Sequence, residues 1–586
     1  MEVSDSPIAI RFGTFELDVR SRELRKGDKR IRLQEQPFEI LYLMLQRPGH
    51  LVTREELCQR LWPEGTFVDF EHSLNAAVKR LRAALGDDAD NPKFVETLPR
   101  RGYRFIGVLE AAATTSCAQV QANESRIAVL PFNNLSNDVS QEYFSDGLTE
   151  ELIAQLGPLC RGRIAVIARR SSMAFKGTTM RARDIAKVLS ARYLLEGSVR
   201  RDGQRVRITA RLVEGDNETE LWSDTHERRV DDWLSVQADV AAHVARSLVV
   251  ELAPRHLAAR STPDPRAHQA YLRARYHWGR PADEGFDDAF QCVYDAVRLA
   301  PTFACAHALL ARLKVGAAEY CRERPRDALD DARAAATRAL ELDPSNNEAR
   351  VALADVRRMG EFDWRSSRGL YRQVLAANPS SEVAHRSYAY LLAIQRRHDD
   401  AIRAADLARH LDPLCTLPAT AAAWARYMAG LYEDAVDACD QVFDVVEDYL
   451  PAVRIRALAR VAAGDGARAA TELEHLVQQS GPHPFVVTAL AHVYGSIGRQ
   501  PEARRLIEPL RETAPTAYVS PYHMALAYVA VDDIDACFDA LGQASRDRDP
   551  SVTHVAIEPR LEPIRRDPRY ARLLNSLNLR PQPYAA

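Results

Sequence analysis

Residues 72–88, HSLNAAVKRLRAALGDD, decide the fold of the first hundred residues. The apolar side chains recur at helical spacing and predict one buried helix face, made of Leu74, Ala77, Val78, Leu81 and Leu85. The opposite face carries polar, small and basic residues, namely Asn75, Ala76, Lys79, Arg80 and Arg82. Three cations on one exposed face suit a helix that lies beside nucleic-acid phosphates. A merely solvated face is the alternative for such charges.

A hairpin is expected after this helix. Residues 94–98 (FVETL) and 102–106 (GYRFI) alternate as two paired strands do. The turn between them contains Arg100 and Arg101, so two guanidinium groups stand at the tip of a β-ribbon. This second basic cluster, on a separate element, favours nucleic-acid binding over the solvated face.

Residues 37–57 precede the helix and read PFEILYLMLQRPGHLVTREEL. Their apolar spacing predicts a helix that begins at Pro37 and ends before the breaker pair Pro48-Gly49. Thr53 and Glu56 then have the spacing of a capping box at the start of a second helix.

Short antiparallel strands are expected at the beginning of the chain, because apolar residues alternate across residues 8–33. Strands, three helices and a basic hairpin, in this order, predict a winged helix-turn-helix. This α+β domain is expected over residues 8–108.

The motifs FELD (15–18), PFEILYLMLQRPGHLVTREEL, RLRAALGDD (80–88) and RGYRF (101–105) resemble the OmpR/PhoB-type DNA-binding domain. The same domain begins CadC-like regulators. The resemblance implies that the third helix enters the major groove of double-stranded DNA and that the hairpin, the wing, approaches the adjacent minor groove.

The resemblance also implies a set of DNA contacts. It places five residues of the third helix near bases or phosphates, namely His72, Asn75, Ala76, Lys79 and Arg80. It places Arg82, Tyr103 and Arg104 near the DNA backbone, and Arg100 and Arg101 at the wing tip. Ala76 offers only a methyl contact, so base reading there is weak. The loop 62–71 is the expected RNA polymerase contact, although its Phe67 and Phe70 also suit plain core anchors.

Residues 109–125 are small, polar and unpatterned, and we interpret them as a linker. Residues 126–252 then alternate buried-type strands with helices and include a hairpin turn at Asp202-Gly203. A long amphipathic helix is expected over 233–252. The pattern predicts an α/β domain with a mixed sheet, and the motifs IAVLPFNN and YLLEGSVRRDG resemble the TolB amino-terminal-type domain.

The middle region shows no motif of an enzyme. Asp146, Glu150 and Glu151 gather at an expected helix start, where acidic side chains are favoured by the helix dipole. Neither a phosphate-binding loop nor a nucleophile elbow is present in the sequence. We therefore expect no enzymatic activity, no catalytic residue, no cofactor and no metal.

Residues 265–580 are repetitive. Prolines that we expect to close helical segments recur at spacings near the 34-residue period of tetratricopeptide helix pairs, at positions 301, 344, 379, 413, 451, 482, 515 and 550. The region resembles a tetratricopeptide array, which implies an all-α superhelix with a concave groove for a protein or peptide. A spacer or a homodimerisation platform is the alternative.

Composition excludes several other classes. The 586 residues have a net charge of −3, so nucleic-acid binding must come from a local patch. The nine cysteines include no C-x-x-C pair, so a zinc site or disulfide framework is not expected. No apolar run is long enough for a membrane helix, and the first residues do not read as a signal peptide. With seven residues before Ile8 and no receiver domain, phosphorylation in cis is not expected, and we place the protein in the cytoplasm, away from membranes.

These features predict a one-component, sequence-specific transcriptional regulator whose repeats recognise a protein partner or a signal. The alternative is a tetratricopeptide scaffold whose winged helix does not bind DNA. The target promoter, activation or repression, the inducing signal and the oligomeric state stay open.

Overall fold

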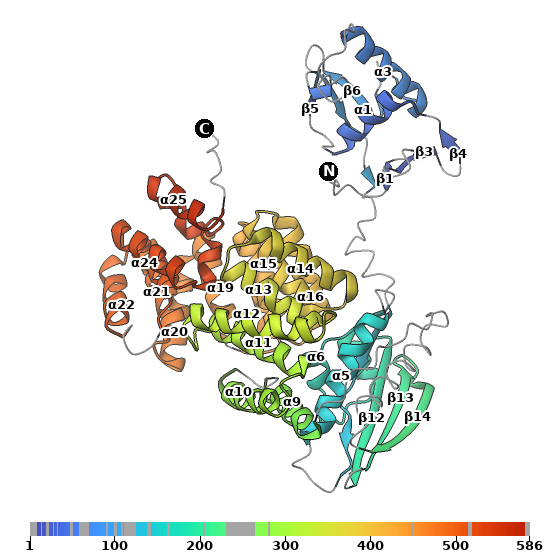
Figure 1. Ribbon diagram of the computed structural model, residues 1–586. Helices are drawn as coiled ribbons and strands as arrows, with labels where there is room; N and C mark the ends of the chain where they lie inside the picture. Colours follow the sequence, from blue (N-terminus) through green and yellow to red (C-terminus); the bar gives the residue numbers. More distant parts are fainter. Residues whose placement is uncertain are drawn as a thin grey trace. The chain divides into compact units, whose positions relative to one another are not determined.

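The chain forms two compact units in the computed structural model, Met1–Asn123 and Glu124–Ala586, and each is described by itself (Figure 1). The structure describes residues 9–12, 15–18, 23–26, 29–31, 33–46, 51–54, 56–57, 70–88, 92–98, 102–106, 109–110, 125–136, 142–160, 164–202, 205–229, 264–278, 282–447, 449–513 and 518–579.

A five-stranded antiparallel sheet opens the first unit, in the order β4-β3-β2-β1-β8. The strands are β1 (Ala9–Phe12), β2 (Phe15–Asp18), β3 (Glu23–Lys26), β4 (Lys29–Ile31) and β8 (Leu109–Glu110). Leu17 and Leu24 are partners in neighbouring strands and are fully buried. The alternation expected for this segment therefore produces strands with one side in the core.

The winged helix follows and confirms the predicted fold class. It consists of α1 (Glu35–Gln46), α3 (Phe70–Leu85) and a three-stranded sheet in the order β5-β7-β6. The strands of this sheet are β5 (Leu51–Thr53), β6 (Val95–Leu98) and β7 (Gly102–Phe105). The five apolar residues of the α3 stripe are all buried, together with Phe38, Leu41 and Met44 of α1.

The predicted capping box is present at the start of the second helix. The Thr53 amide donates to Glu56 Oε2 at 2.9 Å, and the Glu56 amide donates to Thr53 Oγ1 at 3.2 Å. These two bonds satisfy amide groups that have no partner within the helix. Arg54, Glu56 and Leu57 are helical, whereas residues 58–69 lie outside the described residues.

A mixed sheet forms the first part of the second unit, as predicted, in the order β11-β9-β12-β13-β14, with β10 beside β12. Its strands are β9 (Ser125–Val129), β10 (Asn133–Asn134), β11 (Ile164–Val166), β12 (Tyr193–Asp202), β13 (Arg205–Glu214) and β14 (Thr219–Arg229). β9 pairs in parallel with β11 and β12, and β13 pairs antiparallel with β12 and β14. β14 was not predicted, and the helix expected over 233–252 lies outside the described residues.

Helices cover both faces of this sheet, namely α5 (Glu142–Cys160), α6 (Arg169–Met173) and α7 (Ala182–Leu189). Ile127 and Val129 of β9 belong to the core that contains α5, whereas Ala128 and Leu130 belong to the core that contains α7. Successive residues of a strand point to opposite faces, so a continuous apolar strand is expected to be covered on both.

Paired antiparallel helices build the remainder of the second unit, in agreement with the predicted repeats. The first four pairs are α9 (Pro265–Trp278) with α10 (Ala282–Leu299), α11 (Ala304–Glu319) with α12 (Pro325–Leu342), α13 (Asn347–Met359) with α14 (Trp364–Ala377), and α15 (Glu382–Ile394) with α16 (His398–Leu411). The next are α17 (Thr416–Met428) with α18 (Tyr432–Phe443), α19 (Leu450–Ala462) with α20 (Gly466–Ser480), α21 (Pro484–Ser496) with α22 (Gln500–Thr513), and α23 (Pro521–Ala530) with α24 (Ile534–Arg546).

The prolines do not all close helices as the sequence predicted. Pro451 lies in the first turn of α19, and Pro550 opens a short 3-10 helix. A proline fits the first helical turn because its missing amide hydrogen would have no partner there. Pro515 lies outside the described residues.

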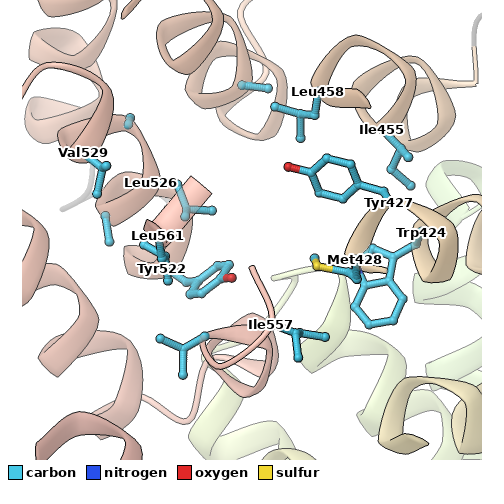
Figure 2. Packing of buried hydrophobic residues seen from close by; sticks show 14 of the residues in the cluster. Trp424, Tyr427, Met428, Ile455, Leu458, Tyr522, Leu526, Val529, Ile557 and Leu561 are labelled. Atoms are coloured by element: carbon cyan, nitrogen blue, oxygen red, sulfur yellow. The ribbon is translucent and has the colours of Figure 1, made fainter. Parts of the chain in front are cut away.

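A C-terminal cap follows the helix pairs and consists of η3 (Pro550–His554), η4 (Pro559–Ile564) and α25 (Pro568–Ser576). Figure 2 shows Ile557 and Leu561 of this segment in the same apolar cluster as Tyr522 and Met428 of the repeats. This C-terminal segment is therefore packed into the core of the repeats.

Backbone and side-chain bonds join the sheet domain to the repeats. The Ala168 amide donates to the Leu411 carbonyl at 2.7 Å, and the amide and hydroxyl of Ser171 donate to Asp412 Oδ1 at 2.8 and 2.7 Å. Residues that the sequence assigned to separate domains thus share buried hydrogen bonds. No helix of the described ranges is long and apolar enough to span a membrane.

We predict that Gly102→Ala destabilises the winged helix by about 3 kcal/mol. Gly102 has a φ of +153°, and an added Cβ would lie 2.1 Å from the Val52 carbonyl oxygen, so β5 and β7 would have to separate. Hydrogen exchange of the β5 and β7 amides in the full chain measures the loss. Gly86→Ala is the control, since Gly86 has a φ of +63° but open space around it, and should cost about 1 kcal/mol. Equal effects of the two substitutions would contradict the steric explanation.

Candidate nucleic-acid interface

The outer face of α3 carries the predicted contact residues. Asn75, Lys79 and Arg80 are exposed and Ala76 is half-buried, while the apolar stripe on the other side is buried. His72 lies within α3, but its side chain is not among those described, and Arg100 and Arg101 lie outside the described residues. The structure therefore brings two cations and one amide together on a single helix surface.

Arg82 connects α3 to the hairpin. Its guanidinium Nη2 donates to the Val95 carbonyl at 2.6 Å and to Thr97 Oγ1 at 2.8 Å. Both acceptors belong to β6, so these two bonds fix the helix relative to the strand that leads to the wing. Of the residues expected near the DNA backbone, Arg82 is thus already engaged within the protein.

Asn75 is held by two residues from other elements. The Tyr103 hydroxyl of β7 donates to Asn75 Oδ1 at 2.7 Å, and Arg54 Nη1 and Nη2 donate to the same oxygen at 3.3 Å. The Arg54 guanidinium also lies 5.4 Å from the centre of the Tyr103 ring. With its oxygen accepting these bonds, Asn75 has its amide nitrogen as the remaining polar group.

Arg54 was missed by the sequence analysis. Its only local signal is the position next to the capping residue, and its partner Asn75 is 21 residues away. Contact between these residues depends on how the start of the second helix packs against α3, which periodicity does not reveal.

Two further contacts orient cations near the interface. Arg80 Nε donates to the Ala76 carbonyl at 3.2 Å, and its Nη1 donates to Gln34 Oε1. Arg104 of β7 pairs with Glu96, directly opposite on β6, with Nη2 and Oε2 2.6 Å apart. Arg80 and Arg104 remain partly accessible, so their contacts to protein atoms orient the side chains without covering them.

Asp87 organises the turn between α3 and the hairpin. Its carboxylate accepts the amides of Lys93, Phe94 and Val95 at 2.6, 3.1 and 2.7 Å. The same carboxylate accepts the Asp88 amide at 3.0 Å, so it satisfies four backbone donors and fixes where β6 begins.

Residues 28–105 match the family described as "Transcriptional regulatory protein, C terminal". These residues form an OmpR/PhoB-type winged-helix DNA-binding domain. The agreement covers the α1, α3 and hairpin geometry described above, which the sequence motifs had predicted.

Curated relatives match parts of the chain. A "Cholera toxin homolog transcriptional activator" of Vibrio parahaemolyticus serotype O3:K6 is 34% identical over 105 residues, 17% of this chain and 36% of that protein. The "Cholera toxin transcriptional activator" of Vibrio cholerae serotype O1 is 32% identical over 127 residues, 21% of this chain and 43% of that protein. "Putative adenylate cyclase 3" of Rhizobium meliloti is 36% identical over 187 residues, 31% of this chain and 32% of that protein. The chain thus spans less than half of the length of each relative.

Two solved structures are similar to parts of the chain. The Klebsiella pneumoniae RstA DNA-binding domain in complex with RstA box is 26% identical, with a TM-score of 0.16, over 17% of this chain and 96% of that one. A tetratricopeptide repeat protein from Parabacteroides merdae is 11% identical, with a TM-score of 0.32, over 46% of this chain and 98% of that one.

We predict that Tyr103→Phe weakens binding to a specific DNA site about 3- to 10-fold, because Asn75 loses the hydroxyl that orients it. The measurement is fluorescence anisotropy with a site that the wild-type chain enriches from a random DNA library. Tyr570→Phe, which removes a buried hydroxyl from the other unit, should leave affinity unchanged. Unaltered affinity in Tyr103→Phe would show that Asn75 does not need this bond.

Proposed function

We propose that this protein is a one-component, sequence-specific transcriptional regulator that binds double-stranded DNA with the α3 face. The observation that carries the proposal is the exposed set Asn75, Lys79 and Arg80 on a helix that Arg82 and Tyr103 hold against the wing. Such a face can present an amide to a base edge and guanidinium or ammonium groups to phosphates.

The proposed roles differ among the predicted residues. Lys79 and Arg80 contact phosphates or bases, Asn75 reads a base edge, and Ala76 offers a methyl contact. His72 also faces DNA in this proposal, and Arg100 and Arg101 enter the minor groove from the wing tip. Arg82, Tyr103 and Arg104 approach the DNA backbone while they hold helix and hairpin in register.

The second unit, which contains the sheet domain and the repeats, recognises the signal and the partner in this proposal. We assign domains to residues 8–108, 126–252 and 265–580, with a linker at 109–125 whose first two residues pair with β1 as strand β8. We keep the resemblance of the middle domain to the TolB amino-terminal type as a prediction. The repeats recognise a protein, a peptide or a second copy of the chain, and the loop 62–71 contacts RNA polymerase. A regulator of this type acts where the DNA is, in the cytoplasm.

We further propose that the protein is not an enzyme. The support is the match to a family of transcriptional regulators and the ion-paired state of the acidic residues at the start of α5. Lys176 Nζ lies 2.7 Å from Asp146 Oδ2, and Arg275 Nη2 lies 2.6 Å from Glu150 Oε1. Because one relative is named for adenylate cyclase, cyclic AMP formation from ATP by the full chain is the direct test, and sustained turnover would overturn this part.

We predict that Lys79→Ala lowers the slope of log K against log salt concentration by about 0.9, because one phosphate contact and its released counterion are lost. Affinity is measured with the full chain at several salt concentrations. Lys187→Ala removes an exposed lysine from α7 of the other unit and should leave the slope unchanged. If Lys79→Ala left the slope unchanged, Lys79 would not contact a phosphate in the complex.

The scaffold function is the second candidate, because the paired helices together with the turns between them make up more than half of the described residues. It predicts that the wild-type chain enriches no motif from a random DNA library and shows no steep salt dependence. Enrichment of a short motif contradicts it.

A further inference from the structure

The C-terminal cap crosses from one end of the repeats to helices far earlier in the chain. The His554 ring of η3 lies 4.7 Å from the Trp424 ring of α17 and 6.3 Å from the Tyr390 ring of α15, measured between ring centres. Trp364 at the start of α14 donates its indole Nε1–H to the Leu577 carbonyl at 3.0 Å. Through His554 the cap therefore lies against α15 and α17, the first helices of successive pairs, and such helices line the inner side of these arrays.

A buried acid in the cap already has its full set of partners. Glu558 receives two bonds from Arg560, at 2.8 and 2.9 Å, and one each from the hydroxyls of Tyr427 and Tyr522, at 3.3 and 3.4 Å. Despite burial, the Arg560 guanidinium holds the pKa of Glu558 at about 2. Glu558 and Arg560 thus neutralise each other.

Arg454 of α19 is different, because no acidic side chain of the described residues pairs with it. Its guanidinium lies 4.0 Å from the centre of the Phe485 ring, and its Nε is buried without a hydrogen-bond partner. Arg456 and Arg460 on the same helix both pair with Glu472. Of the three arginines on α19, Arg454 is therefore the one that has no ion pair within the described part of the chain.

One acid, Glu558, acts on Arg454, but Arg560 already binds that carboxylate, so the two arginines and one acid keep an excess positive charge. The His523 ring packs 5.0 Å from the Phe485 ring that Arg454 covers. Burial first, and then the charges of Arg454 and Arg560, hold the pKa of His523 well below its ordinary value. Burial and Arg560 lower the pKa of His492 to about 3, and its Nδ1 is buried without a partner. Burial and Arg560 likewise lower the pKa of Arg454 to about 10.

Burial of a guanidinium that has no ion pair, as at Arg454, costs folding free energy. Charges removed from water are tolerated when an opposite charge and hydrogen bonds satisfy them. The planar guanidinium matches the two oxygens of a carboxylate or phosphate group, and the ring nitrogens of His492 and His523 can donate further bonds.

We propose that Arg454, His492, His523 and Arg560 form a binding site for the oxyanion group of a small diffusible ligand, a carboxylate or a phosphate. The Phe485 ring supports the guanidinium from one side, and Arg560 of the cap, although it is paired with Glu558, adds positive potential at the site. As the signal input of a regulator the site rests on the proposed function, but anion binding itself does not depend on DNA. Failure of one is therefore distinguishable from failure of the other.

A small ligand fits better than an extended peptide. The cap already occupies the inner helices through His554 and Glu558. A long peptide would have to displace these contacts, whereas a single oxyanion needs only the face of Arg454.

The test is thermal unfolding of the full chain with inorganic phosphate or succinate at constant ionic strength, with chloride as the reference salt. We expect a saturable rise in Tm of about 2 °C or more when a probe exceeds its Kd about 100-fold. Phosphate and succinate distinguish the two oxyanion groups. Arg454→Met keeps an apolar chain over Phe485 and should abolish the rise, whereas Arg468→Met, an exposed arginine of the next helix, should retain it.

Several outcomes would overturn the site. These are the absence of a saturable rise with both probes, or an equal rise in Arg454→Met. Should Arg454→Met fail to fold, Arg454→Lys provides the second variant. It keeps the charge but loses the bidentate fork, so the Kd for the probe should rise at least about 10-fold. An unchanged Kd in Arg454→Lys, or a rise in Tm only with an added acidic peptide, would also contradict the small-ligand site.

Discussion

The buried stripe of α3 is the constraint on which the DNA-binding domain depends. Leu74, Val78 and Leu81 can leave water only if α1 and the hairpin cover them, and this packing turns the opposite face outward. Once the helix is fixed in rotation, Asn75, Lys79 and Arg80 have no inner position available. The hydrogen bonds of Arg82 and Tyr103 then determine how far the wing stands from that face. Burial of the apolar stripe thus determines which face of α3 is exposed, and the hydrogen bonds of Arg82 and Tyr103 determine how the hairpin is placed beside that face.

Features that repeat with a local period could be predicted from the sequence. The 3.6-residue period placed α1 and α3, the two-residue period placed β2, β6 and β7, and the spacing of Thr53 and Glu56 placed a capping box that the hydrogen bonds confirm. The roughly 34-residue period predicted helix pairs. In each case the contacts that determine the element lie within that element or between neighbours in sequence. The sequence pattern therefore predicts the element without knowledge of the tertiary structure.

Contacts between distant residues could not be predicted in this way. Arg54 and Asn75 are 21 residues apart, and Trp364 and Leu577 are 213 apart. Arg454 carries no sequence signal that separates it from Arg456, two residues later. Arg456 is nevertheless paired with acids, whereas Arg454 is not. Proline was also ambiguous, because the same residue that ends one helix suits the first turn of the next, as at Pro451. For the candidate site, the helix face was predictable, but the residues that support it were not.

Helix α17 links the features of the second unit that local patterns did not reveal. At its start, Arg170 of the sheet domain donates to Cys415 Sγ at 3.6 Å, and Ser171 binds the Asp412 carboxylate just before it. Burial and the nearby Glu382 raise the pKa of Asp412 to about 6, so this junction holds a carboxyl that is costly to ionise. Further along the helix, Trp424 and Tyr427 contact His554 and Glu558 of the cap. Coupling between distant sites requires contiguous packing through an element that both sites touch. A ligand that drew Arg560 toward Arg454 would change the hydrogen bonds of Glu558. One of the partners of Glu558 is Tyr427, which lies on α17, and the other end of α17 contacts the sheet domain.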